Sequence, residues 1–239
     1  MILLSADTST KICSVALYKD SDFLSEFSSA TTSHSTVLLP MIEEMLKANN
    51  IKFNEIDVYA VSTGPGSFTG IRIGVSTIKG LAYPYNTACI GVSSLDSLAK
   101  NISGIQGIVV PVIDARNDLV YTSVYNASDN KTEKLIKDSQ ISVSDLLQML
   151  EKNYGDAKIH FTGDAARTLY ERSVDYSIKT VILPNRYMNA SAYGTGKAAL
   201  DLIKDNNDLS SFTYQSLNPV YLKKTQAERE REEKITKNG

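Results

Sequence analysis

IDVYAVSTGPGSFTGIRIGVSTIKGLA, residues 56–82, is the stretch that decides the fold class. The apolar run 56–62 predicts a buried strand, and the apolar pattern over 69–82 predicts a helix that Pro84 ends. The glycines and the proline between these two segments predict a tight loop. A strand, a short loop and a helix in direct succession are typical of an α/β sheet.

The same kinds of element recur on both sides of this stretch. The first half predicts strands at 2–6, 13–18, 23–27, 56–62 and 87–92 and helices at 35–48, 69–82 and 94–101. The second half predicts strands at 108–113, 119–125, 158–162 and 180–183 and helices at 142–152, 165–172 and 190–204. This partly repeated order predicts a duplicated α/β fold with a mixed sheet in each of two lobes. We expect an N-terminal lobe at 1–103, a C-terminal lobe at 104–222 and a charged tail at 223–239.

The composition excludes several classes of protein. Hydrophobic residues make up 42% of the 239 residues, which is enough for a globular core rather than a disordered chain. With 25 Lys and Arg against 27 Asp and Glu, the net charge of -2 provides no general attraction for nucleic acid. The apolar stretches fall far short of the roughly 20 residues of a membrane helix, and no signal peptide is recognisable. We therefore expect a cytoplasmic protein without a membrane partner.

The counts of histidine and cysteine bear on metal and redox chemistry. His34 and His160 are the only histidines and lie far apart in the chain. These counts exclude a zinc site rich in His or Cys, whereas a carboxylate site for magnesium stays open. Cys13 and Cys89 lie in short apolar runs without basic neighbours, so we expect two buried, reduced thiols.

The loop TGPGSFTGIR, residues 63–72, has two interpretations. Its backbone amides, at the N-terminus of the following helix, could cradle an anion. It lacks the spacing of a phosphate-binding Walker loop, and it misses the dinucleotide fingerprint by one residue. The alternative is a purely structural turn at Gly64 and Gly66.

Asp7, Thr8 and Ser9 follow the first strand and also have two interpretations. A carboxylate there suits magnesium and two hydroxyls suit phosphate, so that with Gly64 and Gly66 they would form a vestigial nucleotide site. The alternative is an Asx or hydroxyl turn. Four further polar residues show no spacing that assembles a catalytic site and receive no role: His34, Asp114, Arg116 and Asp118. Asp114 and Asp118 are interpreted as hairpin-turn residues.

The helices at 35–48 and 69–82 carry more apolar and small residues than one inward stripe requires. Pro40 places the start of the regular part of the first helix near Leu39. Glycine inside a helix costs about 1 kcal/mol relative to alanine, so a close approach must compensate for Gly70, Gly74 and Gly80. That approach is either packing inside the chain or contact with another chain, and in the second case Gly74→Arg should abolish association. The residues expected on such a partner surface are Leu38, Met41, Ile42, Met45, Gly70, Ile71, Gly74, Val75, Thr77 and Ile78.

Six segments carry a resemblance to a known family. They are LLSADTSTKICSVALY (3–18), HSTVLLPMI (34–42), VSTGPGSFTGIRIGVSTIKGLA (61–82), IGVSSLDSLA (90–99), IDARNDLVY (113–121) and NPVYLKKTQAE (218–228). Through them the chain resembles the TsaB family, also called YeaZ, over about residues 2–227. The resemblance implies the actin-like, sugar-kinase-like and Hsp70-like (ASKHA) ATPase fold. Leu119 departs from the acidic residue expected before Val-Tyr, which removes the expected polar role of that hairpin.

The resemblance also implies a function. TsaB chains are non-catalytic subunits in the synthesis of threonylcarbamoyladenosine (t6A), the modified adenosine beside the tRNA anticodon. The related transferase TsaD carries a His-x-x-x-His metal pair, and Ser94 and Leu98 stand at the comparable positions here. The chain is therefore expected to bind TsaD, to support its threonylcarbamoyl transfer, and to help recruit the ATPase TsaE. It would meet tRNA only through the complex.

Further expectations concern ligands and self-association. The resemblance implies no catalytic residue, no metal ligand, and no cofactor beyond a weak or shared ATP or ADP contact at the complex interface. It also implies that the same helices pair two copies of the chain as a homodimer when TsaD is absent. The alternative function is an ASKHA-fold ATPase or small-molecule kinase that acts alone through Asp7 and the loop 64–69.

The histidine count, with Ser94 and Leu98, generates a first prediction. The purified chain should contain no stoichiometric zinc and should show no metal-dependent peptidase or transferase activity by itself. Elemental analysis and an activity assay without any partner check this. One equivalent of bound zinc, or transfer without a partner, would contradict it.

Overall fold

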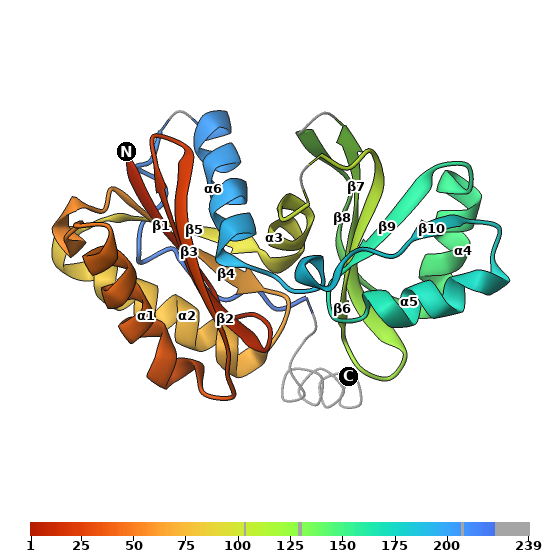
Figure 1. Ribbon diagram of the computed structural model, residues 1–239, viewed down its shortest axis with the longest axis horizontal. Helices are drawn as coiled ribbons and strands as arrows, with labels where there is room; N and C mark the ends of the chain where they lie inside the picture. Colours follow the sequence, from red (N-terminus) through yellow and green to blue (C-terminus); the bar gives the residue numbers. More distant parts are fainter. Residues whose placement is uncertain (103, 129–130, 207, 223–239) are drawn as a thin grey trace, which may run out of the picture.

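The computed structural model describes residues 1–102, 104–128, 131–206 and 208–222, and it consists of two lobes side by side (Figure 1). Each lobe is built on a five-stranded sheet, in the order β3-β2-β1-β4-β5 in the first lobe and β10-β9-β6-β7-β8 in the second. In these described ranges, no helix combines the length and the apolar character that a membrane span requires.

The first sheet is mixed. β1 (Ile2–Asp7), β2 (Ile12–Lys19) and β3 (Asp22–Ala30) form an antiparallel meander. β4 (Val58–Gly64) and β5 (Ala88–Ser93) continue the sheet parallel to β1. α1 (His34–Ala48) precedes β4, α2 (Phe68–Ala82) precedes β5, and α3 (Ser94–Lys100) follows β5.

The second sheet repeats this order element by element. β6 (Gly107–Asp114), β7 (Leu119–Ser128) and β8 (Lys131–Ser142) form the meander, and β9 (Lys158–Thr162) and β10 (Lys179–Val181) run parallel to β6. α4 (Val143–Tyr154), α5 (Ala166–Arg172) and α6 (Ala192–Asn206) occupy the positions of α1, α2 and α3. The predicted duplicated α/β fold with two mixed sheets is confirmed. β8 was missing from the predicted strands because this edge strand is mostly polar and lacks a buried apolar alternation.

The last helix of each half packs on the sheet of the other half. α6 covers one face of the first sheet, where Ala199 and Leu200 lie in a cluster with Tyr18, and α1 and α2 cover the opposite face. α3 packs on the second sheet, where Leu95 and Leu98 contact Ile113. β1 and β4 are buried on both faces for this reason, which explains their nearly continuous apolar sequence.

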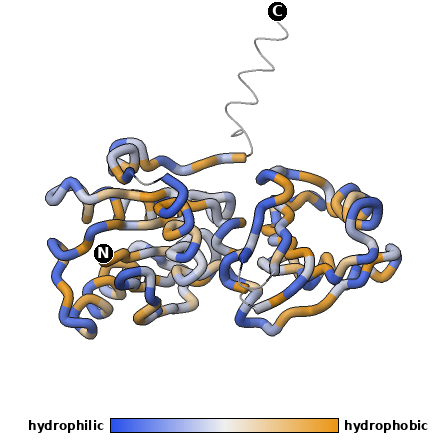
Figure 2. The backbone as a smooth tube through the Cα atoms, turned by 90° about the horizontal axis from the view of Figure 1, so that it is seen from above, coloured by the Kyte–Doolittle hydropathy of each residue, from blue (hydrophilic) through white to orange (hydrophobic). Residues whose placement is uncertain are grey.

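Because the two halves exchange α3 and α6, the division into lobes in space differs from a division at a single point in the sequence. β5 of the first sheet ends at Ser93 and β6 of the second begins at Gly107, but α6, which follows the second sheet in the sequence, belongs by its contacts to the first sheet. Residues 208–222, which we call the C-terminal strap, also run back along the first lobe (Figure 2). There the Cys89 amide donates to the Phe212 carbonyl at 2.8 Å and the Val220 amide donates to the Thr63 carbonyl at 2.8 Å. The predicted charged tail, 223–239, lies outside the described residues.

Two smaller expectations can be compared with the structure. α1 begins at His34 and contains Pro40, so the proline does not delay the regular helix to Leu39. Pro40 is exposed, and water can satisfy the helical carbonyl that loses its partner. Cys13 and Cys89 are buried free thiols, as expected, and burial raises the pKa of Cys13 to about 11 and that of Cys89 to about 12.

Two helix glycines lead to a stability prediction. A Cβ on Gly194 of α6 would lie 2.1 Å from the Ser97 carbonyl oxygen of α3, whereas a Cβ on Gly80 of α2 would meet no atom within 4 Å. Gly194→Ala should therefore lower the free energy of unfolding by about 1–3 kcal/mol through overpacking. Gly80→Ala should raise it by about 0.5–1 kcal/mol, because alanine restricts the unfolded chain and favours the helix. Urea denaturation of both variants checks this, and equal effects would contradict the described contact between α3 and α6.

Candidate functional site

Asp7 lies at the end of β1 and is completely buried. Its Oδ1 accepts hydrogen bonds from the Ser9 amide at 2.9 Å and the Ser9 hydroxyl at 2.7 Å. Its Oδ2 accepts from the Thr195 hydroxyl at 3.0 Å and the Ser97 hydroxyl at 3.3 Å. Burial raises the pKa of Asp7 above its usual range, and the hydrogen bonds from Ser9, Thr195 and Ser97 oppose that rise.

The partners of Asp7 come from three separate parts of the chain. Ser9 belongs to the turn after β1, Ser97 to α3 and Thr195 to α6. Asp7 therefore ties the first sheet to the two exchanged helices, and both carboxylate oxygens are already engaged. Among the described residues, no group of three or more His, Cys, Asp or Glu is placed to hold a metal ion. This geometry favours the interpretation of Asp7 as a turn residue over its interpretation as a magnesium ligand.

The glycine loop fills the space beside the same turn. A Cβ on Gly66 would lie 2.4 Å from the Ser9 carbonyl oxygen, and one on Gly70 would lie 2.1 Å from the Thr8 carbonyl oxygen. The Ser67 amide donates to the Ser9 carbonyl at 2.8 Å, and the Thr8 hydroxyl donates to the Gly70 carbonyl at 2.7 Å. The structure thus brings the turn 7–9 and the loop together, but they pack against each other.

Gly64 and Gly74 are also explained by contacts inside the chain. At Gly64, where φ is +116°, a Cβ would lie 2.7 Å from the Val220 carbonyl oxygen of the strap. A Cβ on Gly74 would lie 2.4 Å from the Thr8 hydroxyl oxygen. The small face of α2 therefore packs on the turn after β1. Gly74→Arg would disrupt the fold itself, so it is not a usable test of association.

Most residues expected on the partner surface point into the first lobe. Met41 and Thr77 are half-buried, and the other eight are buried: Leu38, Ile42, Met45, Gly70, Ile71, Gly74, Val75 and Ile78. The apolar residues among these eight belong to the core between α1, α2 and the sheet. A partner that binds these helices would instead meet their exposed side.

The exposed side of α1 and α2 is a candidate protein-binding surface. The two helices lie next to each other on one face of the first sheet, away from α6 (Figure 1). α1 exposes Leu39, and α2 exposes Phe68 at its start, Arg72, and a row of small residues. This row consists of Thr69, Ser76 and Gly80, which we call the α2 crest.

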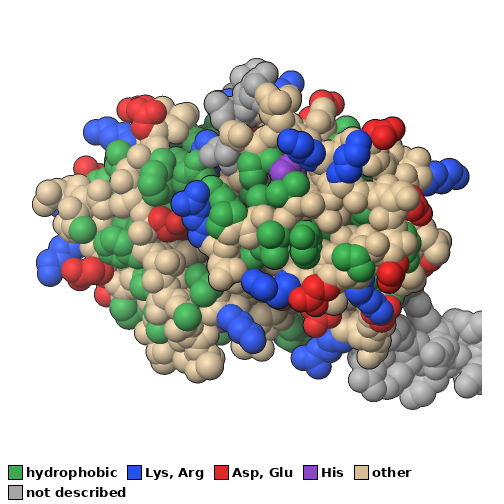
Figure 3. Space-filling view, turned by 45° about the vertical axis from the view of Figure 1, so that its right-hand side comes forward, with side chains coloured by type: hydrophobic (Ala, Val, Ile, Leu, Met, Phe, Trp, Pro, Cys, Tyr) green, Lys and Arg blue, Asp and Glu red, His purple; other side chains and the backbone are tan. Residues whose placement is uncertain are grey.

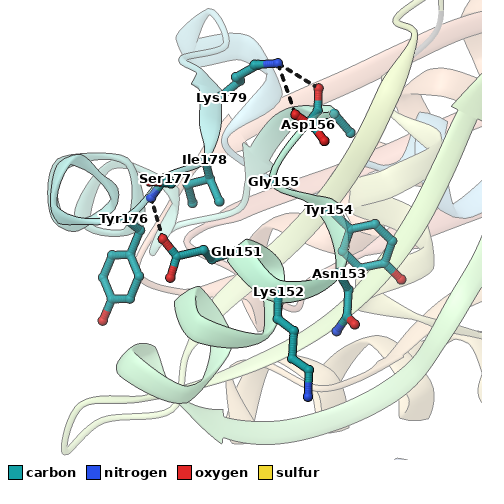
Figure 4. A pocket seen from close by; sticks show the side chains of 11 residues that line it. Glu151, Lys152, Asn153, Tyr154, Gly155, Asp156, Tyr176, Ser177, Ile178 and Lys179 are labelled. Atoms are coloured by element: carbon teal, nitrogen blue, oxygen red, sulfur yellow. Dashed lines mark hydrogen bonds and ion pairs between the residues drawn. The ribbon is translucent and has the colours of Figure 1, made fainter.

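Two other regions, a hollow in the second lobe and the charged face in Figure 3, do not have the features of a ligand-binding or nucleic-acid-binding site. A hollow of about 790 Å³ lies in the second lobe, where the Ser177 amide donates to Glu151 at 2.6 Å and Lys179 pairs with Asp156 (Figure 4). These contacts engage Glu151 and Asp156, and the hollow contains no residue that the sequence singled out. On the face shown in Figure 3, Lys and Arg side chains lie interspersed with Asp and Glu, unlike a nucleic-acid-binding face.

The unassigned polar residues are placed as follows. Asp114 and Asp118 lie at the two ends of the hairpin loop between β6 and β7, where Asp114 accepts from the Arg116 amide at 2.8 Å and Asp118 pairs with Arg172. His34 begins α1 and is buried. Sequence reasoning missed Ser97 and Thr195 as partners of Asp7. They lie 90 and 188 positions away, and no local pattern marks them.

Comparison with known proteins identifies the family. A family model described as TsaD, tRNA N6-adenosine threonylcarbamoyltransferase, matches residues 28–232. The tRNA threonylcarbamoyladenosine biosynthesis protein TsaB of Bacillus subtilis is 31% identical over 164 residues, which are 68% of this chain and 71% of that protein. TsaB of Escherichia coli is 35% identical over 145 residues, 57% of this chain and 63% of that protein.

The similarity extends to a solved structure. YeaZ from Pseudomonas aeruginosa superposes with a TM-score of 0.77 at 26% identity, covering 92% of this chain and 99% of that one. This likeness and the duplicated strand order agree with the expected ASKHA fold class. The chain belongs to the TsaB (YeaZ) family, whose fold it shares in both lobes.

Proposed function

We propose that this chain is a non-catalytic subunit in t6A synthesis that binds TsaD and supports its transfer of threonylcarbamoyl to the tRNA adenosine. The observation that carries the proposal is membership of the TsaB family, whose relatives are named as t6A biosynthesis proteins. The match to the TsaD model adds that the chain is itself related to the transferase. The complex would then contain two homologous chains with different tasks.

The positions comparable to the TsaD metal pair support a non-catalytic role. Ser94 and Leu98 lie one turn apart on α3 and are fully buried. The Ser94 and Ser62 hydroxyls are hydrogen-bonded at 2.6 Å, and Leu98 packs against the second sheet. A hydroxyl and an aliphatic side chain are a poor ligand pair for a catalytic metal. In this chain the buried residues of α3 pack between the two lobes.

The environment of Asp7 disfavours the alternative of an ATPase or kinase that acts alone. Such an enzyme needs a carboxylate with free oxygen lone pairs facing magnesium. Asp7 is completely buried, and four donors from Ser9, Ser97 and Thr195 surround it. We propose that the chain has no cofactor of its own, and that any ATP or ADP contact is shared at the interface with TsaD.

The exposed side of α1 and α2 is proposed as the TsaD-binding surface. Gly80 has no neighbour in the described chain that requires a glycine, although glycine costs about 1 kcal/mol in a helix. Close packing of a helix from another chain against the α2 crest would explain why position 80 is a glycine. The same surface would pair two copies isologously when TsaD is absent. When bound to TsaD, the chain would help recruit TsaE. Transfer RNA would be met through the complex, in the cytoplasm.

A substitution on the α2 crest tests the surface. Gly80→Arg should leave the isolated chain folded, because the position faces open space. It should weaken TsaD binding by at least about tenfold, since the arginine would have to be desolvated without a partner. Isothermal titration calorimetry with TsaD measures the affinity. A complex of full affinity would place the interface elsewhere.

Matched variants separate steric from general effects. Gly80→Ala adds only one methyl group at the proposed close contact, so it should weaken TsaD binding less than Gly80→Arg does. Gln148→Arg, on the exposed side of α4 in the second lobe, introduces the same charge far from the surface and should bind normally. Thermal melts followed by circular dichroism verify that each variant is folded.

A second substitution tests the structural role of Asp7. Asp7→Asn retains one oxygen acceptor, so TsaD-supported t6A formation should stay within a few-fold, whereas loss of a magnesium ligand would cost orders of magnitude. Asp7→Ala should lower the free energy of unfolding by about 1–3 kcal/mol, because it leaves buried donors unsatisfied. Modification assays and urea denaturation measure the two effects. Near-complete loss of activity in a folded Asp7→Asn protein would favour the ATPase alternative.

A further inference from the structure

The C-terminal strap is attached to both ends of α2. At the C-terminal end, the rings of Tyr214 and Tyr83 meet edge to face with centroids 5.5 Å apart. At the N-terminal end, the ring of Tyr221 lies 5.3 Å from that of Phe68. Between these contacts Leu217 is buried in the first core. The strap therefore runs alongside α2 and borders the proposed TsaD-binding surface.

Arg72 organises the N-terminal contact. Its Nε donates to the Tyr221 hydroxyl at 2.8 Å, and its guanidinium carbon lies 3.8 Å from the centre of the Phe68 ring. The backbone beside it is fixed, because the Val220 amide donates to the Thr63 carbonyl at 2.8 Å. Phe68, Arg72 and Tyr221, which we call the anchor, are thus held in place before any partner arrives.

The anchor exposes apolar surface although it is ordered. Phe68 is 48% exposed, Tyr221 is 40% exposed, and the adjacent Val220 is 51% exposed. Within the described ranges, the terminal nitrogens of Arg72 have no hydrogen-bond acceptor. Aromatic rings and arginine dominate binding energy in protein interfaces, and a rigid arrangement reduces the entropy lost on binding.

We infer that the anchor is part of the TsaD-binding surface and that the strap is its third element beside α1 and α2. The inference rests on the proposed function and on continuity, because Phe68 and Arg72 belong to the same helix as the α2 crest. The chemistry of the anchor suits a protein surface that presents a carboxylate to Arg72 and apolar side chains to the two rings. RNA is the less suitable partner, since the Phe68 ring already packs against Arg72 and Tyr221.

Calorimetric titration of the full chain with TsaD tests the inference. Tyr221→Ala and Arg72→Ala should each weaken binding by at least about tenfold. Tyr221→Phe keeps the ring but loses the acceptor for Arg72, so its loss should be smaller, about threefold. Hydrogen exchange should also show that amides of 217–222 become protected in the complex.

The second lobe provides a matched control. Arg186 lies over the ring of Tyr187 at 4.6 Å and donates to its hydroxyl at 2.8 Å, the same chemistry away from the proposed surface. Arg186→Ala should bind TsaD normally. If the unchanged chain fails to bind TsaD, the proposed function is wrong. If the unchanged chain binds and folded Tyr221→Ala binds equally well, the function stands and this inference is overturned. Unchanged TsaD affinity with weakened tRNA binding would overturn it in favour of RNA.

Discussion

The buried carboxylate of Asp7 is the interaction on which the rest of the structure depends. A fully buried carboxylate is tolerated only when its oxygens are hydrogen-bonded, and here donors from Ser9, Ser97 and Thr195 converge on it. Two of these donors belong to the helices that the two halves exchange. The carboxylate therefore links α3 and α6 to the end of β1.

The same arrangement accounts for the glycine loop. In an ATPase, a turn after the first strand and a glycine loop at a helix N-terminus would leave room for phosphate between them. Here Gly66 and Gly70 bring the loop close to the carbonyl oxygens of Ser9 and Thr8, and Gly74 brings α2 close to the Thr8 hydroxyl. In this structure the turn and the loop serve close packing within the first lobe.

Because these residues pack inward, the outer side of α1 and α2 consists of the side chains that the core does not use. The core between these helices and the first sheet already absorbs the large apolar side chains. The exposed residues include the row of small residues along α2 and Leu39 of α1, together with the charged side chains of Glu43, Glu44, Lys47 and Arg72. A surface of this kind suits close contact between helices, and its aromatic end at Phe68 and Tyr221 provides larger contact area.

The sequence by itself determined the fold class, the order of nearly all strands and helices, and the residues of the turn and the loop. These follow from local signals, such as the apolar run 56–62 and the glycines that follow it. The sequence did not predict the edge strand β8, because its mostly polar residues show no apolar pattern. Only the tertiary structure decided that α6 packs on the first sheet, that Thr195 meets Asp7, and that the strap returns to α2. Those contacts join residues far apart in the chain. Their energy depends on burial and complementary shape, which exist only once the chain has folded.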